Sequence, residues 1–99
     1  MFYPIKLDKE RNFRYGMKAI SLIEKKLKTS ISKIDMENIK MEDTAVLIWS
    51  GLQHEDKNLT PEKVMDLVDD YSDITTVMGA MGEAFQEAFG KEVTHEKNE

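Results

Sequence analysis

The stretch Met41 to Leu52, MEDTAVLIWSGL, contains the only tryptophan of the chain and its densest run of apolar residues. On a helix, one face of this stretch carries five apolar side chains: Met41, Ala45, Ile48, Trp49 and Leu52. Val46 and Leu47 project to two other sides. A helix that is apolar on several sides needs several neighbours to cover it. The stretch therefore predicts the central helix of a small helical domain, with Ile48, Trp49 and Leu52 in the core.

The length and composition predict a single small domain. The 99 residues are 40% apolar and 33% charged, which is typical of a polar globular chain. We expect the domain to span residues 1–90 and residues 91–99, which include one apolar side chain, to form a disordered tail. The longest apolar run, AVLIW, is far shorter than the roughly 20 residues that span a bilayer, so no membrane association is expected. The N-terminus lacks the pattern of a signal peptide, and we expect a cytoplasmic protein.

The net charge is −5, from 14 basic and 19 acidic residues. This sign argues against a nucleic-acid partner, because affinity for phosphate needs a basic face. Four lysines do cluster early in the chain, at Lys18, Lys25, Lys26 and Lys28. Glu24 lies among them, and we interpret the group as the solvated face of a helix.

The N-terminal third predicts a short extended segment followed by a helix. Apolar and polar residues alternate over residues 2–15 on both sides of a polar run, which fits either a short β-hairpin or an irregular arm. From Tyr15 to about Lys28 the apolar period lengthens to that of an amphipathic helix. Residues 28–40 predict a packed connection with one helical turn after Asp35.

Two more helices are predicted in the second half. Thr60 followed by Pro61 is a helix-start signal, because threonine caps the free N–H groups and proline fits the first helical position. Ser72 or Asp73 would cap a last helix, which Gly90 would end. The predicted class is mainly α, a small bundle of about four helices.

No catalytic or metal-binding constellation is predicted. His54, Glu55 and Asp56 are adjacent, which places them on different sides of a helix end, and we interpret them as solvated. Asp56, Asn58 and Thr60 imitate the alternating oxygen ligands of a calcium loop, but Pro61 occupies the position of the required glycine. We therefore expect no enzyme activity, no catalytic residue, no metal and no cofactor.

The unusual feature of the composition is methionine, with seven residues. Methionine fills irregular gaps in cores and also lines surfaces that accept varied apolar partners. Core packing is one interpretation of the methionines in the last two helices. The other is a partner-binding face on the last helix, formed by Met78, Met81, Phe85 and Phe89.

Three segments, RYGMKAISLIEKKL, MEDTAVLIWSGLQHED and LTPEKVMDLVDD, resemble in their order and spacing the tail assembly chaperones of long-tailed phages and prophages of Gram-positive bacteria. The resemblance covers about residues 12–75. Its main features are Arg14-Tyr15-Gly16, the segment Leu47 to Leu52 with Trp49 and Gly51, the turn His54-Glu55-Asp56 and an acidic end of the third helix.

This resemblance implies a non-enzymatic protein that acts in the bacterial host cytoplasm. Members of the family coat the tape measure protein, prevent its apolar surfaces from aggregating, recruit tail tube subunits and leave before the virion is mature. The expected partners are accordingly the tape measure protein, the tail tube protein and further copies of the chain. The alternative is a small acidic regulator, such as an antitoxin or an anti-repressor, that covers a basic protein through its surface acids.

Overall fold

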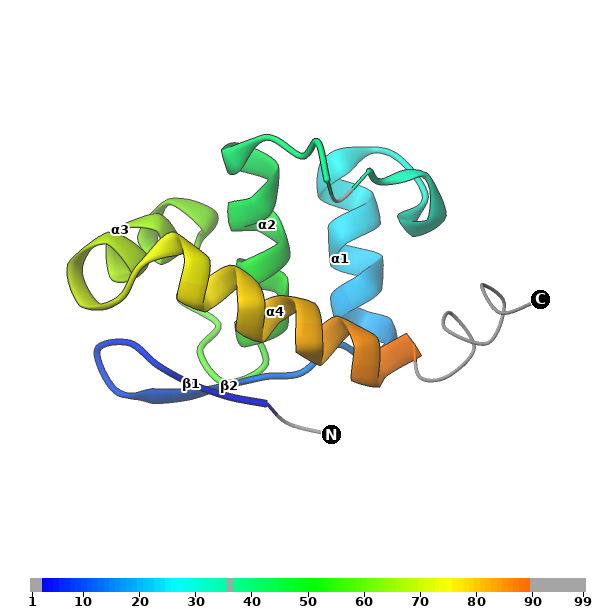
Figure 1. The fold of residues 1–99 in the computed structure, drawn as a ribbon. Coiled ribbons are helices and arrows are strands. Elements are labelled where there is room, and N and C mark those ends of the chain that lie inside the picture. Colours follow the sequence, from blue (N-terminus) through cyan, green and yellow to red (C-terminus); the bar gives the residue numbers. More distant parts are fainter. Residues whose placement is uncertain (1–2, 36, 90–99) are drawn as a thin grey trace.

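The computed structural model describes residues 3–35 and 37–89, which begin with an antiparallel hairpin (Figure 1). Strand β1 (Tyr3–Lys6) pairs with β2 (Glu10–Phe13), so that Tyr3 lies opposite Phe13. The turn between the two strands lacks an Asn-Gly pair. It is held instead by Arg11 of β2, whose guanidinium donates two hydrogen bonds of 2.8 and 2.9 Å to the Asp8 carboxylate in the turn. Of the two possibilities for the N-terminal segment, the chain therefore adopts the hairpin.

Four α-helices follow the hairpin, and the predicted mainly helical class is confirmed. They are α1 (Met17–Leu27), α2 (Met41–Leu52), α3 (Pro61–Tyr71) and α4 (Ile74–Phe89). Helix α2 packs against α1, α3 and strand β2, which makes it the central helix. In Figure 1, α1 and α3 lie on opposite sides of α2, and α4 passes in front of α2 above the hairpin.

The helix starts follow the local sequence signals. The Thr60 hydroxyl accepts a hydrogen bond of 3.1 Å from the Lys63 N–H, and Pro61 is the first helical residue. Of the two candidate caps for α4, Asp73 is the one used, because its carboxylate accepts the Thr76 N–H at 2.7 Å. The predicted stop at Gly90, the tail 91–99 and His95 all lie outside the described residues.

The connection between α1 and α2 differs from the expectation. Its helical turn is a 3-10 helix at Ile31–Lys33, before Asp35 and not after it. Beyond Asp35 the chain makes a single hydrogen-bonded turn, in which the Asn38 N–H donates to the Asp35 carbonyl oxygen at 3.2 Å. The Asp35 side chain also accepts the Glu37 N–H at 3.1 Å. These bonds favour a turn because they compete with continuation of a helix.

The core is centred on α2, as predicted for Ile48, Trp49 and Leu52, all of which are buried. The Trp49 indole N–H donates a hydrogen bond of 2.8 Å to the Leu59 carbonyl oxygen, so the buried ring leaves no polar group unpaired. This bond also fixes the loop between α2 and α3 against the core.

Four aromatic rings join the hairpin to the end of α4, and we call them the aromatic stack: Phe13, Tyr15, Phe85 and Phe89. Ring centroids are 5.7 Å apart between Phe13 and Tyr15, 4.2 Å between Tyr15 and Phe85, and 5.9 Å between Phe85 and Phe89. The Tyr15 hydroxyl donates to the Leu47 carbonyl oxygen of α2 at 2.7 Å. The stack therefore ties three separate parts of the chain together.

Gly51 allows this close approach to α2. A Cβ atom at position 51 would lie 2.5 Å from Cζ of Tyr15 and 2.8 Å from Cδ1 of Phe13, which is closer than carbon atoms can pack. The Gly51 carbonyl oxygen also accepts the Arg14 N–H at 2.9 Å. Position 51 is thus restricted to glycine by packing.

Candidate partner-binding groove

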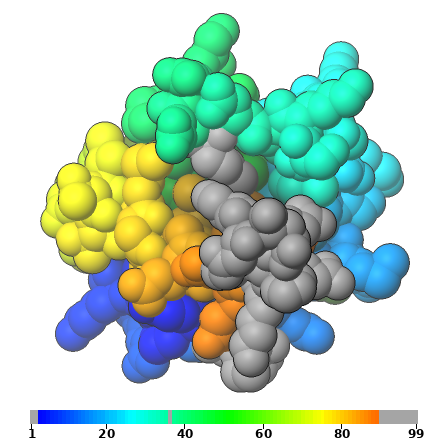
Figure 2. Space-filling model, turned by 45° about the vertical axis from the view of Figure 1, so that its right-hand side comes forward, coloured from blue at the N-terminus to red at the C-terminus, as the bar shows by residue number. Residues whose placement is uncertain are grey.

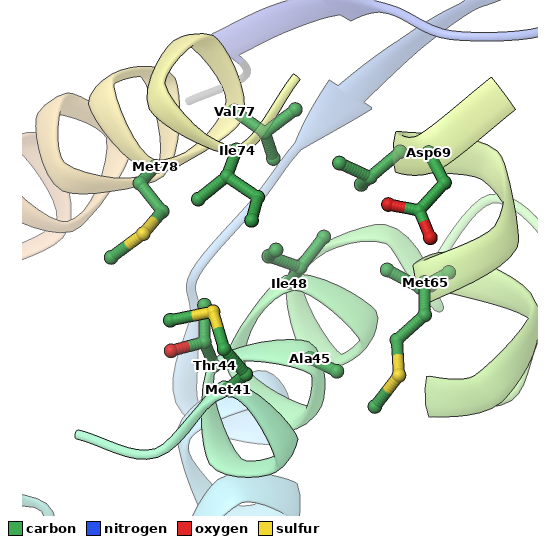
Figure 3. A pocket seen from close by; sticks show the side chains of 11 residues that line it. Met41, Thr44, Ala45, Ile48, Met65, Asp69, Ile74, Val77 and Met78 are labelled. Carbon is green, nitrogen blue, oxygen red and sulfur yellow. The ribbon is translucent and has the colours of Figure 1, made fainter. Parts of the chain in front are cut away.

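An apolar groove opens between α2, α3 and α4 (Figure 3), and we call it the methionine groove. Its volume is about 230 Å³. The lining residues are Met41, Thr44, Ala45 and Ile48 from α2, Val64, Met65, Val68 and Asp69 from α3, and Ile74, Val77 and Met78 from α4. Figure 2 shows the first part of α4, in yellow, next to the segment that leads into α2, in green.

The floor and the rim of the groove differ in exposure. Val64 and Val77 on the floor are fully buried. On the rim, Met41 is 51% exposed and Ile74 is 50% exposed, and both border the same groove. The side chains of the floor are therefore covered by other residues of the same chain, whereas the side chains of the rim leave apolar surface exposed to water.

The chemistry of the lining suits an apolar polypeptide segment. Met41, Met65 and Met78 each come from a different helix, and Figure 3 shows them around the opening. Their unbranched thioether side chains can adapt to partners of different shape. Among the described residues, Asp69 is the only charged one in the lining, and no acid-base pair is formed there. Its volume is below the roughly 300–1,000 Å³ of small-molecule sites.

The four residues predicted to bind a partner do not share one surface. Met78 lines the methionine groove. Met81 and Phe85 are only 5% and 8% exposed and belong to the core. Phe89 is half-buried and borders a second, open hollow of about 410 Å³ between the end of α4 and the 3-10 helix at Ile31–Lys33.

The sequence did not predict that Met41 and Ile74 border a groove. It placed Met65 among the methionines of the last two helices but did not assign it to the core or to the surface. Met41 shares a helical face with core residues, which predicts burial. It is exposed because it is the first residue of α2 and extends beyond the helices that cover Ile48. The signal that could have located the groove is the methionine at one edge of each of three helices.

His54 and Glu55 are exposed but hold the hairpin in place. His54 Nε2 lies 2.7 Å from the Asn12 carbonyl oxygen, and the Glu55 carboxylate accepts the Asn12 backbone N–H at 3.1 Å and its side-chain N–H at 2.9 Å. Partial burial acts to raise the pKa of Glu55, but the hydrogen bonds from Asn12 outweigh it and hold the pKa below its usual value. The interpretation of this turn as merely solvated is therefore incomplete.

Asp56 completes this attachment through a buried arginine. Arg11 is 4% exposed, and its guanidinium lies 3.6 Å from the Asp56 carboxylate in addition to its bidentate bond to Asp8. The hydrogen bond from Arg11 lowers the pKa of Asp8. Asp56 also accepts the Asn58 N–H at 3.0 Å, so its oxygen atoms shape a turn. Within residues 3–35 and 37–89 no three His, Asp or Glu side chains are grouped as metal ligands.

Comparisons of the chain with models of known protein families, with curated proteins and with solved structures gave no match. Over the described ranges, no helix is long and apolar enough to cross a membrane.

Proposed function

We propose that this protein is a phage tail assembly chaperone that binds apolar segments of the tape measure protein in its methionine groove. The observation that carries the proposal is a groove with a buried apolar floor and an exposed rim of methionine and isoleucine side chains. Such a surface favours association with another apolar segment, because burial of each large side chain releases about 1.5–3 kcal/mol.

The proposed role follows the family that the sequence resembles. The protein acts in the bacterial host cytoplasm, keeps the tape measure protein from aggregating, helps to recruit tail tube subunits and is not retained in the mature virion. It associates with copies of itself in doing so. Tyr15 and Gly51, two residues that carry the resemblance, contact each other in the core. Their spacing in the sequence therefore reflects a packing requirement of the fold.

Co-expression with a tape measure protein encoded by the same phage or prophage tests this function. We expect the chain to co-purify with the tape measure protein and to increase its soluble fraction. Met78→Glu should reduce co-purification by about tenfold or more, because it places a charge on the rim of an apolar contact.

Met17→Glu is the matched control, because Met17 is 90% exposed and does not line the methionine groove. It should co-purify like the unmodified chain. An unchanged solubility of the tape measure protein, or equal binding by both variants, would contradict the proposal.

One observation favours the second candidate, an acidic regulator that covers a basic protein. Residues 41–89 contain two lysines against eleven acidic residues, whereas residues 14–40 contain seven basic residues against three acidic ones. Binding through these acids alone would be lost almost completely between 0.05 and 0.5 M salt, since salt screens exposed charges over about 10 Å or less. A complex held mainly by apolar contacts persists under the same conditions.

A further inference from the structure

One edge of the methionine groove carries a row of negatively charged side chains from α3. Glu62, Asp66 and Asp69 occupy positions i, i+4 and i+7 of α3, so they form one exposed ridge beside Met65. Within the described ranges, none of the three has an ion-pair partner. Lys63 precedes Asp66 by one helical turn, and its ammonium group donates to the Asn58 carbonyl oxygen at 3.4 Å.

The two edges of the groove differ in charge. On the α3 side, the ridge supplies three carboxylates. On the α2 side the charges are mixed, because Lys40 precedes Met41 and Glu42 and Asp43 follow it. A partner that carries positive charge along one side would therefore be attracted more strongly to the α3 side, which would favour one orientation in the groove.

The dimensions of the groove indicate how much of a partner it can hold. Along α2 the lining extends from Met41 to Ile48, which is about two helical turns or roughly 11 Å. A helix that presents apolar side chains at positions i, i+4 and i+7 places three of them within this length. The volume of about 230 Å³ accommodates the ends of a few such side chains and no larger group.

We propose that the methionine groove selects an amphipathic helix of another polypeptide that carries lysine or arginine along one side of its apolar anchors. This inference rests on the proposed function, in that it takes the groove to be the binding site, and it adds the chemical class of the segment. The apolar anchors contact the rim methionines while the basic residues pair with Glu62, Asp66 and Asp69. Selection by charge explains how an adaptable methionine surface can still reject most apolar segments.

Methyl NMR of the full chain with labelled methionines tests the proposal. The first probe is a synthetic amphipathic helix with leucines at i, i+4 and i+7 and lysines along one flank; the second has glutamates in place of the lysines. With the lysine helix, we expect the methyl signals of Met41, Met65 and Met78 to shift and those of Met17 and Met81 to stay. The glutamate helix should bind about tenfold more weakly, because three exposed charge pairs are replaced by repulsion.

Charge reversal in the protein supplies the matched control. The double variant Asp66→Lys and Asp69→Lys should reverse the preference and bind the glutamate helix more tightly. Glu87→Lys makes the same change of charge at an exposed position of α4 that does not line the methionine groove, and it should leave the preference unchanged. Lysine near the C-terminal end of a helix is favoured by the helix dipole, so we expect all three substitutions to leave the fold intact.

Each other outcome overturns the inference. Equal affinity for both helices would refute selection by charge, while co-purification with the tape measure protein would still uphold the proposed function. Shifts confined to Met17 or absent altogether would refute the groove as the binding site. Concentration-dependent shifts of Met41, Met65 and Met78 without any added helix would assign the groove to a second copy of the chain instead.

Discussion

Helices α2 and α4 each have a closed end and an open end, and the two ends are built from different residues. At the closed end, Gly51 of α2 and Phe85 of α4 hold Tyr15 between them. At the open end, Met41 of α2 and Ile74 of α4 border the methionine groove and are about half exposed. The same pair of helices thus forms a tightly packed core at one end and an unfilled surface at the other.

This difference separates stability from adaptability. The closed end uses rigid aromatic rings and a glycine, a combination that fits only one arrangement. The open end uses methionine, whose flexible side chain keeps several arrangements accessible. We infer that the closed end fixes the fold, so that the open end can change its packing without unfolding the protein.

The largest expected difference between the closed and the open end appears when the same charged residue is introduced at each end of α4. Phe85→Glu should abolish cooperative folding, because loss of a buried phenylalanine costs about 3–5 kcal/mol and burial of a carboxylate costs several more. That total is comparable with the roughly 5–15 kcal/mol stability of a small domain. Met78→Glu should remain folded. Circular dichroism melting curves distinguish the two, and a folded Phe85→Glu variant would show that the closed end does not fix the fold.

Substitution of glycine by alanine gives opposite signs at the two ends. Gly51→Ala should lower the free energy of unfolding by about 1–3 kcal/mol, because the new methyl group overlaps the Tyr15 ring. Gly79→Ala should raise it by about 0.5–1 kcal/mol, because a Cβ atom at position 79 meets no atom within 4 Å and alanine favours the helix. Urea denaturation measures both values. Destabilisation by both substitutions would contradict the proposed difference in packing.

The smallest expected effect concerns the start of α4 at the open end. Hydrogen bonds from the Thr76 backbone N–H and hydroxyl lower the pKa of Asp73 from its ordinary value of 3.8. Since the folded pKa is depressed, the stabilisation is complete above the unfolded pKa and is lost as the pH falls through the folded pKa.

Asp73→Asn provides the comparison, because asparagine retains the cap without the charge. We expect the variant to melt slightly below the unmodified protein at neutral pH, and the gap to close as the pH falls through the folded pKa of Asp73. A gap that is independent of pH would show that the Asp73 charge contributes nothing to the cap.

Much of the fold could be predicted because its signals are local. The Thr60-Pro61 start depends only on the capping hydroxyl and the fixed proline backbone, and the apolar face of residues 41–52 depends only on helical periodicity. The hairpin could not be decided from sequence. Its stability depends on Arg11 and on Glu55, which is 43 residues away from its partner Asn12.

The candidate site was predicted only in part, for a related reason. Periodicity identifies the apolar face of each helix but not which part of that face another helix covers. Met81 and Met78 are three residues apart and share an apolar face, yet Met81 is buried and Met78 lines the groove. The angle at which α4 crosses α2 decides between them, and a tertiary angle leaves no local sequence signal.

The contact between the first strand and the last helix has a consequence for synthesis of the protein. Tyr3 donates a hydrogen bond to Glu83, 80 residues later, and Tyr15 stacks on Phe85. On the ribosome, β1 and Tyr15 emerge early and can meet β2 and α2, but their contacts with Glu83 and Phe85 must wait until α4 has left the exit tunnel. The contacts that join the hairpin to α4 therefore form last, after the residues of α4 are complete.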